Sequence, residues 1–306
     1  MANIHQEERF MILYKYRADS EYTEKIFNDK KIWLSLPDDL NDPFECSIQN
    51  VMEDIIDKIV QKEKSEQLEG LVFTYSISPE GKKLWGLPKH KIKKLMYQIG
   101  LAKSFDMKYE IYRRFIYERT GNYPSDPNTK YQHIKQKIKR VGIFSLSENV
   151  DNELMWGHYS DGGRGVAIGF SVNPDSKLSR KSNCIKVNYN NDNIVLYERL
   201  KTSLVFGYDE NLALFYQNIS FDDPFFLSVI STKTEAWSYE SEWRYVEEAS
   251  GLFDLPAPIA EIVFGLKCPQ SVRTKYINLI KKNFENNIEF YEIINIGKRL
   301  VKIKME

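Results

Sequence analysis

The sequence predicts an α+β fold with a mixed β-sheet core and a helical insertion over residues 50–140. Two patterns predict this fold. Short apolar and aromatic segments with alternating polarity, which are typical of β-strands, occur before residue 50 and after residue 140. Between them the chain is rich in lysine and repeats its apolar residues every three or four positions, as amphipathic helices do. We therefore expect residues 1–306 to form a single α+β domain whose strands bracket the insertion.

The N-terminal segment is expected to contribute two strands, 11-MILYKYR-17 and 31-KIWLSL-36, with a short helix between them. Ser20 suits the N-cap of that helix, because its hydroxyl can accept a hydrogen bond from a free backbone N–H of the first turn. The stretch 37-PDDLNDPFE-45 is expected to be a loop, since proline, Asp and Asn favour turns. In the insertion, helices are expected at 50–64, 90–120 and 129–140.

After the insertion the chain alternates between strand and helix patterns. Strands are expected at 141–148, 165–172, 184–189, 242–247, 261–266, 288–293 and 299–304. Helices are expected at 151–160, 192–201, 209–217 and 271–284. The first of these helices should place Leu154, Met155, His158 and Tyr159 near one side and end at the glycines of 161-DGGRG-165.

Charge and composition exclude several classes of protein. Lys and Arg together number 43, as do Asp and Glu, so no global field draws the chain onto nucleic acid or an anionic membrane. The N-terminus lacks the pattern of a signal peptide, and no segment approaches the ~20 apolar residues of a membrane helix. We expect a cytoplasmic protein without a membrane partner. Cys46, Cys184 and Cys268 are isolated and form no CxxC, so neither a disulfide framework nor a zinc site is predicted.

The first candidate site lies in 239-YESEWRY-245. Alternate side chains of a strand share one face, so an extended segment here places Glu240, Glu242 and Arg244 together, opposite its aromatic residues. Two carboxylates on one face attract a cation or a developing positive charge. The alternative interpretation is an exposed polar face in which Arg244 neutralises one glutamate.

Four further segments carry candidate residues, each with a structural alternative. Ser145 and Ser147 share a strand face and can orient a sugar, or can simply form a polar strand edge. His158 lies with Trp156 and Tyr159 on a helix, where a solitary histidine is also a common core residue. Arg164, in 162-GGRG-165, can meet a phosphate, although a glycine cluster alone is weak evidence. Asp42 either makes an Asx turn or faces a cleft.

The motifs taken together resemble a bacterial family called domain of unknown function 2971. The resemblance rests on the order of LYKYR, 41-NDPFE-45, FSLSE, MWGHYSDGGRG running into VAIGF, and a lysine before WSYESEWR. These motifs span about residues 13–247, and 260-AEIVFG-265 continues the pattern. The family's name assigns no activity, so the resemblance implies the order of the motifs along the chain but no catalytic mechanism.

A second resemblance is to the ADP-ribosyltransferase-like fold. Enzymes of that class carry an arginine or histidine on a first strand, a serine on a second and a Glu-x-Glu pair on a later strand. Here Arg17, the serines of 144-FSLS-147 and Glu240-Ser241-Glu242 follow that order. The departures are the position of Arg17 at its strand end, the Ser-Leu-Ser motif and the long insertion. Glu261 is a rival for the catalytic glutamate.

This second resemblance implies an NAD-consuming transferase or NAD glycohydrolase, with NAD as the substrate. Glu242 would stabilise an oxocarbenium-like transition state, and Glu240 would orient an acceptor, which can be a protein or a nucleic acid. The serines would position the ribose. The implied catalytic set is therefore Glu242, Glu240, Ser145 and Ser147. The implied substrate-binding set is Arg17, Tyr14, Trp156, His158, Tyr159, Arg164, Asp42 and Arg244.

Two other functions remain open at this point. A metal-dependent nuclease or phosphoesterase would use Asp42, Glu45, Glu240 and Glu242 as ligands for a hard cation. A non-enzymatic sensor or interaction protein would instead lock the two glutamates in salt bridges to arginines, with no open pocket. A role as a toxin-like phage-defence effector is conceivable, but no motif specifies it, and the sequence does not set the oligomeric state.

Overall fold

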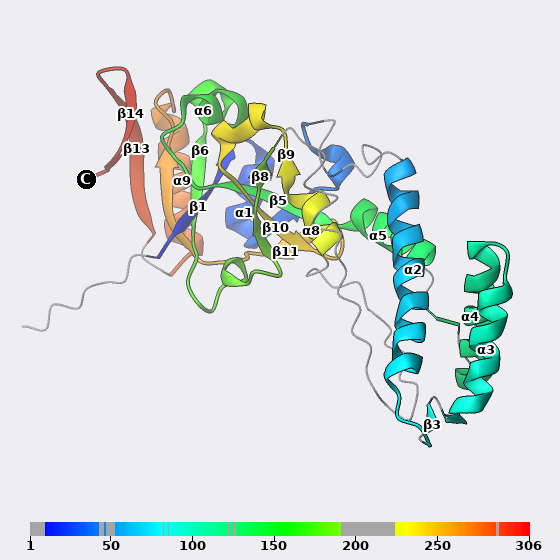
Figure 1. Cartoon of the computed structure of the whole chain (residues 1–306). Coiled ribbons are helices and arrows are strands. Elements are labelled where there is room, and N and C mark those ends of the chain that lie inside the picture. Colours follow the sequence, from blue (N-terminus) through cyan, green and yellow to red (C-terminus); the bar gives the residue numbers. More distant parts are fainter. Residues whose placement is uncertain are drawn as a thin grey trace, which may run out of the picture. The chain divides into compact units, whose positions relative to one another are not determined.

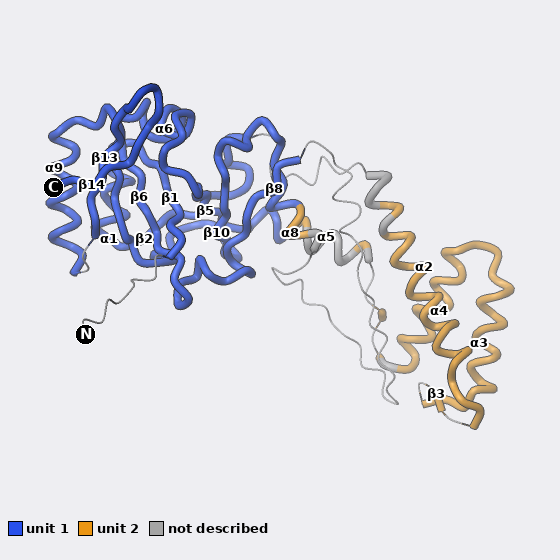
Figure 2. The backbone as a smooth tube through the Cα atoms, turned by 60° about the vertical axis from the view of Figure 1, so that its left-hand side comes forward, with its two compact units in different colours: residues 1–47, 137–192, 229–306 blue, residues 48–136, 193–228 orange. Residues whose placement is uncertain are grey.

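The chain is described by a computed structural model in which residues 10–42, 46, 53–81, 83–84, 86–121, 123–124, 127–190, 224–285 and 288–306 are placed. The helices expected at 192–201 and 209–217 lie outside these described residues. Two compact units are present, unit 1 formed by residues 1–47, 137–192 and 229–306 and unit 2 by residues 48–136 and 193–228 (Figure 2). The predicted α+β class is confirmed, because helices and a mixed sheet occur in one chain.

Unit 1 is built on a sheet of eight described strands in the order β14-β13-β12-β6-β1-β5-β10-β7 (Figure 1). Neighbouring strands are antiparallel except for β12 and β13, which are parallel, so the sheet is mixed as predicted. The strands are β1 (Ile12–Arg17), β5 (Gly142–Ser147), β6 (Val166–Ser171), β7 (Cys184–Lys186), β10 (Glu242–Glu247), β12 (Ile259–Phe264), β13 (Glu289–Ile296) and β14 (Arg299–Lys304).

Different elements cover the two faces of this sheet. One face packs against helices α1 (Glu21–Asp29) and α9 (Gln270–Asn283) and against the strand pair β2 (Lys31–Leu34) and β11 (Gly251–Asp254). The other face packs against helix α6 (Glu153–Tyr159) through a smaller apolar cluster. The candidate serines and Glu242 share the α6 side of the strands, because they alternate with the residues that enter the larger core.

The sheet opens between two neighbouring strands, β1 and β5. These strands pair at a single position, Tyr14 with Ser147. Further along β5, Ile143 instead exchanges both backbone hydrogen bonds with Ser35, at 2.8 and 2.9 Å. Because hydrogen-bonding direction alternates along a strand, Ser145 also directs its backbone N–H and C=O toward this edge, into the gap.

Unit 2 is helical in its described part. It contains α2 (Glu53–Ile77), the hairpin of β3 (Lys83–Leu84) and β4 (Leu87–Pro88), α3 (Lys89–Leu101) and α4 (Phe105–Thr120). Helix α5 (Pro127–Arg140) begins in this unit and ends in unit 1. The helix expected over 90–120 is two helices, because the Ser104 hydroxyl accepts a hydrogen bond from Met107 N–H and starts a new one.

Several short elements complete the described chain. They are α8 (Pro224–Ser231), the parallel pair β8 (Asn188–Tyr189) and β9 (Thr232–Lys233), and the 3₁₀ turns at Pro37–Asp39, Asp161–Gly163, Lys177–Ser179 and Glu235–Glu240. Within the described part of the chain, every helix is too short or too polar to cross a membrane.

Replacing Gly165 with alanine is expected to lower the free energy of unfolding by about 2–3 kcal/mol, measured by urea titration. A Cβ atom at Gly165 would lie 2.1 Å from the Arg17 carbonyl oxygen, so the backbone must shift. Gly157→Ala is the matched control, because a Cβ at this exposed helical position meets no atom within 4 Å. Similar effects of the two substitutions would contradict the close approach at Gly165.

Candidate functional site

A pocket of about 240 Å³ opens at the gap between β1 and β5. Lys15 and Leu146 belong to the opposite side of their strands from Tyr14 and Ser147, yet all four line the pocket. The pocket therefore enters the gap between the strands and is not confined to one face of the sheet. Its lining consists of residues 14–16, 39–41 and 145–147 with Met155, Tyr159, Lys233, Glu240 and Glu242.

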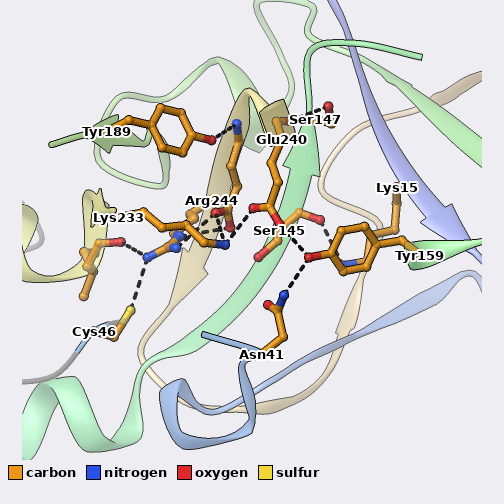
Figure 3. A network of polar contacts seen from close by, with 12 residues as sticks. Lys15, Asn41, Cys46, Ser145, Ser147, Tyr159, Tyr189, Lys233, Glu240 and Arg244 are labelled. Atoms are coloured by element: carbon orange, nitrogen blue, oxygen red, sulfur yellow. Dashed lines mark hydrogen bonds and ion pairs between the residues drawn. The ribbon is translucent and has the colours of Figure 1, made fainter. Parts of the chain in front are cut away.

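A buried lysine joins the two candidate glutamates at the wall of this pocket. Lys233 Nζ lies 2.6 Å from an oxygen of Glu240 and 3.4 Å from an oxygen of Glu242. The three side chains are 2%, 5% and 3% exposed, so the ion pairs are shielded from water. Figure 3 shows Lys233 and Tyr159 reaching Glu240 from two sides. The pair of glutamates is thus held at fixed positions by positive charge.

Arg244 pairs with Glu242 on the side away from the pocket lining. Its Nε and Nη2 atoms donate to the two carboxylate oxygens, each at 3.0 Å, which is bidentate pairing. A third donor, Nη1, bonds the carbonyl oxygen of Ile230 at 2.6 Å and contacts the sulfur of Cys46 at 3.2 Å. Arg244 pairs with Glu242, as the alternative interpretation expected, but both side chains are buried and do not form the exposed polar face of that interpretation.

The expectation that residues 239–245 are fully extended is wrong. Strand β10 begins only at Glu242, and Glu240 ends the preceding 3₁₀ turn. Ser241 between them has a φ of 44°, a left-handed conformation that reverses the direction of the chain. This turn brings Glu240 back to the pocket, where Tyr159 Oη donates to its carboxylate at 2.5 Å. Glu240 and Glu242 therefore converge through a turn and through Lys233, not through strand alternation.

Other hydroxyl groups fix the same turn. Ser147 Oγ donates to the carbonyl oxygen of Glu240 at 2.7 Å. The backbone N–H of Glu242 donates to Tyr189 Oη at 2.7 Å. On the outer side, Asn41 Nδ2 donates to Tyr159 Oη at 2.6 Å, which connects the loop before residue 43 to the carboxylates.

The charged groups have shifted pKa values. Burial alone would raise the pKa of Glu242, but the charge and hydrogen bonds of Arg244, followed by the charge of Lys233, lower it to about 2. The Ser145 hydroxyl also lowers the pKa of this carboxylate. Burial, followed by the hydrogen bond to Glu240, raises the pKa of Tyr159 above its usual range. At neutral pH the pocket therefore holds an ionised Glu242 and a protonated tyrosine.

Ionised Glu242 should make the folded state more stable above about pH 4.5. Its folded-state pKa is about 2, below the ordinary value of 4.5, so its contribution is lost as the pH falls from about 4.5 towards 2. We expect the difference in unfolding free energy between the wild type and Glu242→Gln to narrow over that range. Urea titrations at several acidic pH values measure it, and a constant difference would contradict the lowered pKa.

Six of the predicted site residues line the pocket. They are Tyr14, Ser145, Ser147, Tyr159, Glu240 and Glu242. Arg244 lies behind Glu242, outside the lining. Asp42 is buried and is also outside the lining formed by the described residues.

The remaining four predicted residues lie elsewhere in unit 1. Trp156 is a core residue, whose indole N–H donates to the Val150 carbonyl oxygen and whose ring meets Tyr16 edge to face. His158 and Arg164 are exposed, and Arg164 contacts Asp161. Arg17, at the end of β1, has a buried Nε without a hydrogen bond in the described structure, and it does not line the pocket. Leu154, on the same helix, is half exposed.

Glu261, the rival glutamate, is placed beside the pocket but not in its lining. Its carboxylate accepts hydrogen bonds from Tyr14 Oη at 2.8 Å and from Lys302 Nζ at 2.7 Å. Glu45 lies outside the described residues. Among the residues that are described, no group of three or more His, Cys, Asp or Glu side chains is arranged to hold a metal ion. The three cysteines are buried, and none of them forms a disulfide bond within the described residues.

Lys15, Asn41 and Lys233 line the pocket, although they belong to neither of the predicted residue sets. Lys233 has a visible signal, because it is the lysine that precedes WSYESEWR in the family pattern. Lys15 and Asn41 lie within the motifs LYKYR and NDPFE, next to residues that were selected. Their roles depend on the gap between β1 and β5 and on the loop contact to Tyr159, which no local pattern encodes.

Residues 155–245 match the model of a family described as "Protein of unknown function (DUF2971)". The match confirms the first resemblance, and it includes Tyr159, Lys233, Glu240, Glu242 and Arg244. No curated protein and no solved structure matches the chain.

Proposed function

We propose that this chain is an NAD-consuming enzyme, an NAD glycohydrolase or an ADP-ribosyltransferase-like transferase, that acts in the pocket between β1 and β5. The supporting observation is Glu242, a buried carboxylate at the pocket wall whose pKa of about 2 keeps it ionised. Cleavage of the bond between nicotinamide and ribose passes through an oxocarbenium-like state. A fixed negative charge in a site shielded from water favours such a state without needing to reorganise.

The residues around Glu242 could bind the ribose and phosphate groups of NAD and orient the acceptor. Ser145 and Tyr159 place hydroxyl groups at the carboxylates, where ribose hydroxyls would bind. Glu240, bonded to Tyr159, would orient the acceptor, which is water in a glycohydrolase and a protein or nucleic acid in a transferase. Lys15 and Lys233 are the cations in the pocket lining, so they replace Arg17 as the expected partners of phosphate.

The size of the pocket limits how NAD would bind. Its volume of about 240 Å³ is below the ~300–1,000 Å³ of sites that enclose a drug-sized ligand. The nicotinamide riboside half would therefore enter the gap, and the adenylate half would lie at its mouth. The proposal places the protein in the cytoplasm, and a toxin-like phage-defence role would follow from depletion of NAD.

Incubation of the purified chain with NAD tests the proposal. We expect release of nicotinamide, followed by chromatography, and either free ADP-ribose or an ADP-ribosylated product when cell extract is added as a source of acceptors. Absence of both nicotinamide release and labelled product, with folded protein and extract present, would overturn it.

A second candidate function is a non-enzymatic ligand sensor. The salt bridges of Glu240 and Glu242 with Lys233 and Arg244 favour it, because they restrain both carboxylates. The open pocket distinguishes this arrangement from a purely structural core. Calorimetric binding of NAD without nicotinamide release would support the sensor. A metal-dependent nuclease is less favoured, because both carboxylates already pair with protein cations.

A further inference from the structure

Lys15 differs from the other lysine of the pocket in its partners. Its Nζ donates to the Ser145 carbonyl oxygen at 2.9 Å and lies 4.7 Å from the centre of the Phe144 ring. Lys233, by contrast, contacts two carboxylates. Within the described residues, Lys15 has no carboxylate in ion-pair contact. Its positive charge is therefore not neutralised at short range.

The gap in the sheet accounts for the position of Lys15. Ser145 directs its carbonyl oxygen toward β1, but the backbone of β1 has already diverged there. The Lys15 side chain supplies the missing donor. A neutral amine keeps two N–H donors and can still make this bond, although more weakly than an ammonium, and it has a lone pair that can act as a nucleophile.

The electrostatic surroundings favour the neutral amine. Burial, followed by the charge of Arg17 on the same strand, lowers the pKa of Lys15 to about 7, while Glu242 and Glu240 partly oppose the shift. Asp39 and Lys233, of opposite charge, also line the pocket. The Phe144 ring favours the ammonium, but a cation–π contact contributes only about 0.5–2 kcal/mol. Lys15 therefore loses its proton more readily near neutral pH than an ordinary lysine does.

We propose that Lys15 is an imine-forming amine for small aldehydes, such as open-chain sugars, that enter the pocket between β1 and β5. The amine nitrogen adds to the aldehyde carbon, and loss of water gives an imine, R–CHO + H₂N–Lys → R–CH=N–Lys + H₂O. A pocket of about 240 Å³ holds a sugar of three to five carbons, and Ser145, Ser147 and Tyr159 offer hydroxyl groups to it. This activity goes beyond NAD cleavage and does not require it.

Reductive trapping tests the proposal. The full chain is incubated with glyceraldehyde, or with ribose, and sodium cyanoborohydride, which reduces the imine to a stable amine. Peptide mass spectrometry then measures the labelling rate of each lysine. We expect Lys15 to react at least tenfold faster at pH 7 than the exposed Lys186 and Lys304, and its rate to level off above about pH 7. Exposed lysines should continue to gain rate towards their pKa of ~10.4.

Two variants control the result. Lys15→Arg keeps a donor for the Ser145 carbonyl oxygen and should lose the fast-labelled peptide, whereas Lys186→Arg should leave it unchanged. Labelling of Lys15 at the rate of the exposed lysines or more slowly, or no labelling of it, would overturn the proposal. The assay contains no NAD, so its failure is distinct from failure of the proposed NAD cleavage.

Discussion

Replacing Glu242 with glutamine is expected to lower the rate of nicotinamide release from NAD by about 10²- to 10³-fold, the range seen when one preorganised electrostatic group is removed. Glutamine keeps the size of the side chain but removes the charge that faces the developing cation. It also replaces one acceptor oxygen with a donor, which disturbs the bidentate pairing with Arg244. Nicotinamide release is measured by chromatography under saturating NAD.

The matched control for this substitution is Glu247→Gln on the same strand. Glu247 pairs with Lys177 and lies outside the pocket lining, so its removal should change nicotinamide release by less than about twofold. Circular dichroism at the assay temperature checks that both variants are folded. Equal rates for Glu242→Gln and the wild type would exclude Glu242 as the stabilising carboxylate, even if NAD is cleaved.

Replacing Arg244 with methionine is expected to lower the free energy of unfolding by about 3–5 kcal/mol, as removal of one partner of a buried ion pair does. The variant leaves Glu242 buried with Lys233 as its remaining partner, at the longer distance of 3.4 Å. It also removes a donor from the Ile230 carbonyl oxygen. Urea-induced unfolding of the variant and the wild type measures the loss.

A double substitution separates the unpaired charge from the loss of packing. Arg244→Met combined with Glu242→Leu should be clearly less destabilised than the sum of the two single variants, because neither charge is then left unpaired. Lys233 keeps its pairing with Glu240 in this double variant. Additive losses would show that the two side chains contribute independently and that the bidentate pair is not the source of the effect.

Much of unit 1 follows from local sequence patterns. The strands expected at 242–247 and 299–304 are observed with the same bounds, because polar and apolar residues largely alternate along each of them. The extended interpretation failed at residues 239–241, where aromatic residues suggested a strand although the chain turns at Ser241. Serine rarely adopts a left-handed backbone conformation, so no sequence pattern predicted this turn.

The sequence predicts which side chains of one strand share a face, but it does not predict the contacts between side chains of different strands. Alternation predicts that Ser145 and Ser147 share one face of their strand, and both side chains line the pocket together with Glu242. Arg17 was placed by analogy with a motif, and it lies away from the pocket. The contacts of Lys15 and Lys233 depend on which strands are neighbours and where they separate, which is set by long-range pairing.

The opening between β1 and β5 divides the sheet into two unequal groups of strands, which stay paired only where Tyr14 meets Ser147. One group contains β14, β13, β12, β6 and β1, and the other contains β5, β10 and β7. A ligand in the pocket would contact residues on both sides of this opening and would hold the two groups of strands together. Any molecule that binds the folded chain alone raises its stability by RT ln(1 + [L]/Kd). Thermal melting is therefore a direct screen for the natural occupant of this site, whatever its chemistry.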